Sequence, residues 1–262
     1  MRGRVVVITG ASGGIGAATA RRVAALGGRP VLAARREAEL ARVAADCGPD
    51  AIAIRADVTS RDDVRRVVDD TLAAAGGIDV WINNAGRGIT RPVLALTDAE
   101  FDEMMLVNVK SALYGIQAVL PHFMERGKGH VINVSSMLGR VPWVSMRSAY
   151  SAAKHALNAL TANLRMDLRV TYPGIHVTTV LPGVVATEFG LHALGGGPDS
   201  RSFPNAQPVE EVAAVLVDAI LHPRPDVYTR PALREMAAAY YATDDLDALE
   251  SKPPFLPAAP RG

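Results

Sequence analysis

The stretch Arg4-Val-Val-Val-Ile-Thr-Gly-Ala-Ser-Gly-Gly-Ile-Gly16 decides the fold of this chain. Its first half is a continuous run dominated by β-branched residues, which is typical of a strand buried on both faces of a parallel sheet. A glycine-rich turn follows at once, and an alanine-rich helix then extends to Leu26. A strand, a glycine turn and a helix N-terminus in this order form an anion site, because unpaired backbone N–H groups and the positive end of the helix face the bound group.

The glycines of this turn, Gly10, Gly14 and Gly16, stand as G-x-x-x-G-x-G, whereas the usual dinucleotide-binding fingerprint is G-x-G-x-x-G. Their physical roles are the same: a tight turn, close backbone approach to a pyrophosphate, and close packing of the helix on the strand. A glycine-rich turn alone is a weak signal, but the strand before it and the helix after it strengthen the prediction. We therefore predict a dinucleotide-binding turn.

Strand and helix patterns alternate along the rest of the chain. Helices are expected at about 37–46, 59–75 and 209–221, from the capping box Thr97-Asp-Ala-Glu100, and around Tyr150. Further strands are expected at about 30–34, 51–55, 78–82, 129–136, 174–181 and 226–229. This alternation predicts an α/β fold: a single doubly wound (Rossmann) parallel sheet of about seven strands flanked by helices.

We place this domain at residues 1–243. Within it, the Gly- and Pro-containing segment at about 188–208 is expected to be a lid loop over a substrate site, because long loops in compact domains are usually functional. Residues 244–262, which include Pro253, Pro254, Pro257 and Pro260, are expected to form an irregular C-terminal tail.

The composition narrows the class of protein. Apolar residues make up 49% of the 262 positions, and the formal net charge of +1 gives no basic face, so nucleic acid and membranes are not expected partners. Apolar runs are shorter than the roughly 20 residues that span a bilayer, and the strand that begins by Val5 leaves no room for a signal peptide. The single cysteine, Cys47, cannot form an internal disulfide, which fits a reducing cytoplasm. We expect a cytoplasmic protein without a metal site.

The end of the second strand bears on the choice between NAD and NADP. NAD-binding folds usually carry an acidic residue about 20 positions after the glycines, where it binds the ribose hydroxyl. Here the sequence is Ala33-Ala34-Arg35-Arg36, with no acid before Glu37. An arginine at this place can pair with a 2′-phosphate, although both arginines could also be ordinary solvated charges. We expect NADP to be preferred, with Arg35 better placed than Arg36.

Several polar residues follow the ends of other predicted strands. Asn83-Asn84-Ala85-Gly86, Ser135-Ser136 and Pro182–Thr187 all lie at the carboxyl edge of the sheet, where α/β folds bind their ligands. Asn108 is an amide in an otherwise apolar stretch of helix, and such a residue is more often a packing or kink device than a catalyst.

Tyr150-Ser-Ala-Ala-Lys154 places a phenol and an ammonium on one face of a helix. Lowering the pKa of a tyrosine from about 10 by about 3 units takes about 4 kcal/mol. A cation about 4 Å away, at an effective dielectric of about 20, supplies about that much. Lys154 is therefore sufficient in principle to make Tyr150 a proton shuttle, and a second positive charge would help.

Together these motifs resemble the short-chain dehydrogenase/reductase family, in its group of about 250 residues, over roughly residues 4–230. The resemblance implies that Tyr150 is the general acid in ketone reduction and the base in alcohol oxidation. It implies that Ser136 binds the substrate oxygen, that Lys154 lowers the pKa of Tyr150 and binds the nicotinamide ribose, and that Asn108 holds a water in a proton relay. The cofactor-binding residues that it implies are Gly10, Ser12, Gly14, Ile15, Gly16, Arg35, Arg36, Asp57, Val58, Asn84, Ala85, Gly86, Tyr150, Lys154, Pro182, Gly183, Val185 and Thr187.

Two departures from the family pattern stand out. Ser136 precedes Tyr150 by 14 positions, one more than expected, so the loop Val141–Ser148 carries an extra residue in the substrate-binding region. Position 13 is glycine, where many NADP-dependent members carry Lys or Arg, which leaves Arg35 to support the NADP preference.

The favoured function is NADP(H)-linked interconversion of a ketone or aldehyde and an alcohol, with an apolar small-molecule substrate. Two alternatives are a non-catalytic NADP-binding regulatory protein and an epimerase or dehydratase of the larger branch of the superfamily. The resemblance also implies a homo-oligomer, either a dimer or a tetramer, with a tetramer as the expected form. Candidate pocket residues are Leu138, Trp143, Val144, Met146, Phe189, Leu191 and Leu194.

Overall fold

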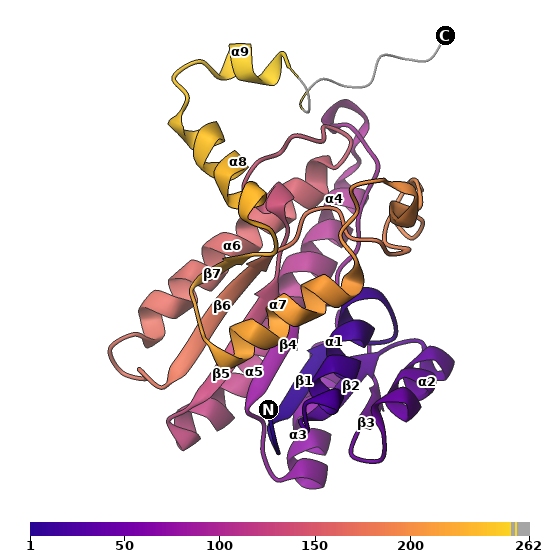
Figure 1. The fold of residues 1–262 in the computed structure, drawn as a ribbon, viewed down its shortest axis with the longest axis vertical. Helices are drawn as coiled ribbons and strands as arrows, with labels where there is room; N and C mark the ends of the chain where they lie inside the picture. The colour runs from indigo at the N-terminus through magenta and orange to yellow at the C-terminus, as the bar shows by residue number, and fades with distance from the viewer. Residues whose placement is uncertain (253–254, 256–262) are drawn as a thin grey trace.

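The computed structural model describes residues 1–252 and residue 255. Seven parallel strands in the order β3-β2-β1-β4-β5-β6-β7 form one sheet with helices on both faces (Figure 1), as the alternating sequence pattern predicted. The chain moves outward from β1 to β3 and then crosses back to β4, which is the doubly wound arrangement. The strands are β1 (Val5–Thr9), β2 (Arg29–Ala34), β3 (Ile52–Arg55), β4 (Val80–Asn83), β5 (Gly129–Val134), β6 (Ile175–Leu181) and β7 (Asp226–Tyr228).

The central strand β1 is buried on both faces, which explains its unbroken apolar sequence. Val6 and Ile8 pack against α1 (Gly14–Ala25), α2 (Glu37–Cys47) and α7 (Val209–Leu221). Val5 and Val7 face α3 (Arg61–Ala75), α5 (Ser111–Arg126) and the end of α6 (Ser148–Leu168) on the other side.

Local capping sets where several helices begin. The Ser60 hydroxyl accepts a hydrogen bond from the Asp63 N–H at the start of α3. The predicted capping box is formed: the Thr97 and Glu100 side chains each bond the backbone N–H of the other at the start of α4 (Asp98–Met105). A π-helical turn, Leu106–Lys110, then joins α4 to α5 and carries Asn108. Such turns are frequent at functional sites.

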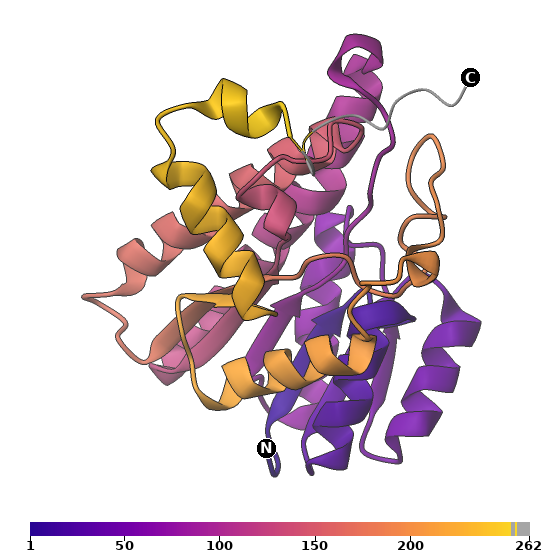
Figure 2. The same ribbon diagram turned by 45° about the horizontal axis from the view of Figure 1, so that its top comes forward.

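The C-terminal part differs from the prediction. A helix, α8 (Pro231–Ala242), follows β7, and Pro231 at its first position suits a helix start. A short helix, α9 (Leu246–Glu250), lies in the segment expected to be irregular, and the Asp245 carboxylate caps it by accepting the Ala248 N–H at 2.8 Å. Figure 2 shows α8 rising from the carboxyl end of β7 and α9, in yellow, near the top of the view. The four prolines on which the prediction of an irregular tail rested lie outside the described residues.

The predicted lid segment, 188–208, makes several contacts with the rest of the domain. It contains a short 3₁₀ turn, Ser200–Ser202, and its residues Leu194 and Gln207 pair with Ile89 and Val185 as isolated parallel bridges. Within the described residues, no helix has the length and apolarity needed to cross a bilayer.

A buried chain of hydrogen bonds joins β4, β5 and α6 behind the carboxyl edge. The Trp81 indole donates to Asn83 Oδ1 at 2.7 Å, and Asn83 Nδ2 donates to Asn133 Oδ1 at 2.8 Å. Asn133 Nδ2 continues to the Thr161 hydroxyl at 2.9 Å. Gly115 of α5 packs directly on this chain, since a Cβ there would lie 2.4 Å from both Trp81 Nε1 and Asn83 Oδ1.

Replacing Gly115 with alanine should therefore destabilise the protein. Helix propensity alone favours alanine by about 1 kcal/mol, but overpacking a core costs about 1–3 kcal/mol and here also disturbs the Trp81–Asn83 hydrogen bond. We expect a lower midpoint in thermal or urea unfolding. Glu125→Ala, on the exposed face of the same helix, should change stability by less than about 0.5 kcal/mol. An unchanged or raised midpoint for Gly115→Ala would show that this contact is not tight.

Candidate functional site

A hydrogen-bonded joint holds the end of β1 against the end of β4. The Thr9 hydroxyl accepts the N–H groups of Asn84 and Ala85 at 3.0 and 3.1 Å, and Asn84 Nδ2 donates to the Thr9 carbonyl at 2.9 Å. Side chains could not fit in this joint. A Cβ on Gly10 would lie 2.8 Å from Ala85 Cα, and one on Gly16 would lie 2.6 Å from the Gly10 carbonyl.

The turn that follows has the features of a pyrophosphate cradle. Gly10 and Gly14 adopt φ angles of +68° and +53°, which favour glycine. In the described structure no side chain caps α1 at its N-cap, Gly13, so backbone N–H groups and the helix dipole remain for an anion. Ser12, Ile15 and Gly16 belong to the same turn, so the residues present fit the diphosphate of a dinucleotide.

The two candidate arginines at the end of β2 have different environments. Arg36 donates to the Ser12 hydroxyl from Nε and Nη2 at 3.2 and 3.1 Å, and its Nη2 would be 3.1 Å from a Cβ on Gly13. The Arg35 side chain is 73% exposed and lies 3.9 Å from the Asp57 carboxylate. The expectation that Arg35 is better placed than Arg36 is therefore not supported, because only Arg36 turns toward the glycine turn.

Two further predicted segments reach the same edge. Asp57 follows β3, and its Oδ1 accepts the N–H and hydroxyl of Thr59 at 2.9 and 2.7 Å, while Val58 packs into the core. After β6, the Pro182 carbonyl accepts the Met137 N–H at 2.8 Å.

The segment after Pro182 then returns to the glycine turn. Gly183 lies beside Leu233 of α8, and Val185 is buried in the core. The Thr187 methyl group would be 3.3 Å from a Cβ on Gly14. Gly14 and Thr187, which are far apart in the sequence, therefore lie next to each other.

Tyr150, Lys154 and Ser136 are all buried at this edge, with exposed fractions of 8%, 4% and 8%. Lys154 Nζ donates to the Val134 carbonyl at 2.9 Å and lies 5.6 Å from the centroid of the Tyr150 ring. The Phe189 ring meets the Tyr150 ring edge-on, with centroids 5.6 Å apart. Burial lowers the pKa of Lys154 to about 8.

The predicted lowering of the Tyr150 pKa by Lys154 is not seen in this arrangement of side chains. Burial raises the pKa of Tyr150 to about 12, and the groups that oppose this rise are the Ser136 hydroxyl and the Arg147 guanidinium. The hydrogen bond that the Lys154 ammonium donates goes to the Val134 carbonyl.

Arg147 was not among the predicted site residues. Its Nη1 donates to the Ile89 carbonyl at 3.1 Å and would be 2.9 Å from a Cβ on Gly88. No carboxylate in the described chain lies within ion-pair distance of it, and burial lowers its own pKa. Its position three residues before Tyr150 on the lengthened loop was the available signal, since residues at i and i+3 share a helix face.

Asn108 is fixed by the backbone of Arg87. Its Oδ1 accepts the Arg87 N–H at 3.2 Å, and its Nδ2 donates to the carbonyls of Arg87 and Met104, both at 3.0 Å. A Cβ on Gly86 would lie 2.9 Å from Asn108 Oδ1 and 3.7 Å from Lys154 Nζ. Gly86 thus separates the amide from the ammonium.

The candidate pocket residues divide into three groups. Leu138, Phe189 and Leu194 pack with Tyr150, together with Ile89 and Met104, which the sequence did not single out. Trp143 instead joins a cluster with α8 residues, which explains why it is not at the phenol. Met146 and Leu191 are 42% and 47% exposed, and Val144 is half-buried, with its carbonyl accepting the Arg147 N–H at 2.8 Å. Over the described residues, no three His, Cys, Asp or Glu side chains gather as a metal site.

Several solved structures resemble this fold. A short chain dehydrogenase/reductase from Burkholderia phymatum, in complex with NAD, is 26% identical with a TM-score of 0.85, and 98% of each chain is covered. An alcohol dehydrogenase from the archaeon Thermococcus sibiricus, complexed with 5-hydroxy-NADP, is 26% identical with a TM-score of 0.75, over 86% of this chain and 95% of that one. A metagenomic short-chain oxidoreductase in complex with NADP is 31% identical with a TM-score of 0.73, over 88% and 98%.

Sequence relatives agree with this likeness. An uncharacterized oxidoreductase, YxnA of Bacillus subtilis, is 34% identical over 241 residues, 87% of this chain, which spans 65% of the length of YxnA. The uncharacterized oxidoreductase SSP1627 of Staphylococcus saprophyticus is 37% identical over 193 residues, covering 73% of this chain and 78% of the relative. The family model described as short chain dehydrogenase matches residues 4–192, and the chain therefore belongs to the short-chain dehydrogenase family.

Proposed function

We propose that this oxidoreductase interconverts a ketone or aldehyde and an alcohol, using NADP(H) in preference to NAD(H), with carbonyl reduction of an apolar substrate as its main direction. The observation that carries the proposal is the meeting, at one sheet edge, of a pyrophosphate cradle with the buried side chains of Ser136, Tyr150 and Lys154. When bound, the nicotinamide cofactor supplies or accepts the hydride, which side chains cannot do.

Tyr150 acts as the proton donor to the carbonyl oxygen. Because burial raises the pKa of Tyr150 to about 12, the phenol is protonated at neutral pH, as an acid in reduction must be. The Ser136 hydroxyl binds the same oxygen and stabilises the charge that develops there. Lys154, with its pKa lowered to about 8 by burial, gives up and regains protons readily near neutral pH, and so can resupply the phenol.

The preference for NADP(H) is supported by Arg36. Its guanidinium and the Ser12 hydroxyl lie beside the glycine turn, where a 2′-phosphate would add a charge-assisted contact. The remaining cofactor contacts are proposed for the glycine turn, Asp57, Val58, Asn84 to Gly86, and Pro182 to Thr187.

The apolar side chains around Tyr150 support an apolar carbonyl compound as substrate, because Leu138, Phe189 and Leu194 would surround the group beside the carbonyl. We also propose a cytoplasmic homo-oligomer, dimer or tetramer. We propose α5 and α6 as the helices of the contact, where Met124 and Met166 are 37% and 60% exposed.

Replacing Tyr150 with phenylalanine should lower kcat for ketone reduction by about 10²- to 10⁴-fold, because the general acid is lost. The assay is a panel of ketones and secondary alcohols with NADPH or NADP, read at the nicotinamide absorbance, with cofactor binding measured separately. Tyr172→Phe, at a half-buried tyrosine just beyond the far end of α6, is the matched control. Wild-type-like turnover by Tyr150→Phe would exclude this residue as the acid.

The two arginines can be separated by cofactor preference. Arg36→Gln should weaken NADPH relative to NADH by about 10-fold or more, since a hydrogen bond to a charged group contributes about 1.5–3 kcal/mol. Arg35→Gln should change the ratio less. The measurement is the KM ratio of the two cofactors, which cancels any general damage to the turn. A larger change at Arg35, or an equal loss of both cofactors at Arg36, would contradict the assignment.

The charge on Arg147 should appear in the pH dependence. Arg147→Met removes a cation that lowers the pKa of Tyr150, so the apparent pKa should rise and the pH–rate profile of alcohol oxidation should move to higher pH. Lys154, whose ammonium lies 5.6 Å from the centroid of the Tyr150 ring, is unchanged, while Arg87 and Arg91 are paired with Glu103 and Glu100. Arg147→Lys keeps the charge and should keep the profile. Identical profiles for Arg147→Met and the wild type would remove Arg147 from the mechanism.

A further inference from the structure

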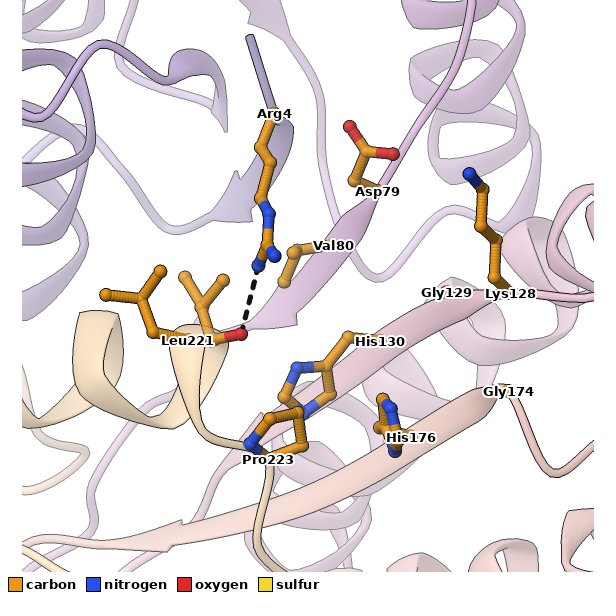
Figure 3. Close-up of a pocket in the computed structure, with 11 residues that line it drawn as sticks. Arg4, Asp79, Val80, Lys128, Gly129, His130, Gly174, His176, Leu221 and Pro223 are labelled. Atoms are coloured by element: carbon orange, nitrogen blue, oxygen red, sulfur yellow. Dashed lines mark hydrogen bonds between the residues drawn. The ribbon is translucent and has the colours of Figure 1, made fainter. Parts of the chain in front are cut away.

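A cavity of about 400 Å³ lies at the amino edge of the sheet, opposite the catalytic edge (Figure 3). It is bounded by the residues that enter β1, β4, β5 and β6, and by the end of α7 with Leu221 and Pro223. This volume is sufficient for a small ligand. None of the residues proposed for catalysis or cofactor binding lines it.

The walls of this cavity carry an excess of positive charge. Arg4 and Lys128 contribute two cations, and in the described chain neither forms an ion pair. The one carboxylate of the wall, Asp79, is already engaged on both oxygens: Oδ1 with Arg126 at 3.0 Å and Oδ2 with the Val5 N–H at 2.9 Å. An anion would therefore meet two cations whose charges are not neutralised by a carboxylate, although Arg4 now donates to the Ile220 carbonyl.

His130 supplies a second, independent feature. Its ring is 4% exposed, and its Nδ1 is buried without a hydrogen-bond partner among the described residues. The His176 ring meets it edge-on with centroids 5.8 Å apart, and in Figure 3 the Arg4 side chain points from β1 toward His130 and Leu221. Buried polar atoms rarely lack partners, so this nitrogen requires an explanation.

The tautomer of His130 follows from its other nitrogen. Nε2 lies 2.8 Å from the Thr178 hydroxyl, and that hydroxyl donates its single proton to the Arg224 carbonyl at 2.7 Å. Thr178 can therefore only accept from His130, so Nε2 carries the proton and Nδ1 is a lone-pair acceptor. Burial, with His176 and Arg4 nearby, lowers the pKa of His130 to about 3, which keeps the ring neutral. The unpartnered atom thus needs a ligand that donates a hydrogen bond.

We propose that this cavity binds a small oxyanion that retains a hydroxyl group, of the hydrogen phosphate type. Its anionic oxygens bind Arg4, Lys128 and the His176 ring, and its P–OH donates to His130 Nδ1. His130 Nδ1 is buried, so side chains must move before the ligand hydroxyl can reach it. In the proposed complex the exposed Arg4 side chain leaves the Ile220 carbonyl, which it now bonds at 3.1 Å, and binds the anion. Inorganic phosphate near neutral pH carries both the charge and the hydroxyl.

Sulfate is the matched comparison, because it has the size and charge of phosphate but no proton to donate. Calorimetric titration of the full chain at constant ionic strength should give phosphate binding at least about 10-fold tighter than sulfate binding. This difference is the contribution expected from the hydrogen bond between the phosphate hydroxyl and His130 Nδ1. Arg4→Gln should weaken phosphate binding by about 10-fold or more. The His130 imidazole ¹⁵N resonances should shift with phosphate and not with sulfate, a readout that needs no variant of the buried ring.

Controls separate this site from the cofactor cradle, which also attracts phosphate. Arg36→Gln and saturating NADPH should leave the binding unchanged, and Arg22→Gln, an exposed arginine elsewhere, should behave as the wild type. Absence of binding, equal affinity for sulfate, phosphate affinity unaltered in Arg4→Gln, or competition by NADPH would each overturn the proposal. The outcome does not depend on whether the protein reduces ketones.

Discussion

The joint between Thr9 and Asn84 is the contact on which the rest of the catalytic edge depends. It fixes the end of β1 against the end of β4, and through Ala85 it determines how closely the glycine turn can approach. From there the chain passes through Gly86, whose missing side chain leaves room for Asn108 on one side and Lys154 on the other. Asn108 then fastens the Arg87 backbone to the π-helical turn. The proposed cofactor cradle and the proposed proton-transfer pair thus share one set of glycine contacts, so a change in the joint would move both.

Burial is the dominant electrostatic influence on the two side chains proposed for proton transfer. It disfavours the charged forms of Tyr150 and Lys154 alike, raising the pKa of the phenol and lowering that of the ammonium. The phenol is therefore an acid that needs help to become a base, which is the reason to favour the reductive direction. Arg147 keeps its charge when half-buried because a guanidinium is protonated at any ordinary pH. In the proposed mechanism the role of Arg147 is electrostatic, whereas Lys154 is the group that exchanges protons.

The sequence predicted the order and type of most elements because β1 and its neighbours are apolar on both faces and glycines mark the turns. Local signals also placed the capping box at Thr97 and the start of α3 near Ser60. What the sequence could not give was the direction of long side chains. Arg36 rather than Arg35 faces Ser12, Lys154 bonds Val134, and Trp143 packs on α8, and each outcome depends on tertiary neighbours. The helix α8 was missed because its packing residues, such as Leu233 and Ala237, meet a surface that only the folded chain assembles.

The two edges of the sheet would hold anions by different means. At the carboxyl edge, helix N-termini and glycine backbone provide the positive field, so the cradle requires few charged side chains. At the amino edge lie the C-termini of the helices, whose carbonyl oxygens carry partial negative charge and repel an anion. Arg4 already donates to one of these carbonyls, that of Ile220 at the end of α7. A site at this edge must therefore be built from side chains, and Arg4, Lys128 and His176 have to outweigh the helix end. Its affinity would then depend on individual residues far more than the cofactor cradle does, and it could be lost in a relative without any change in the fold.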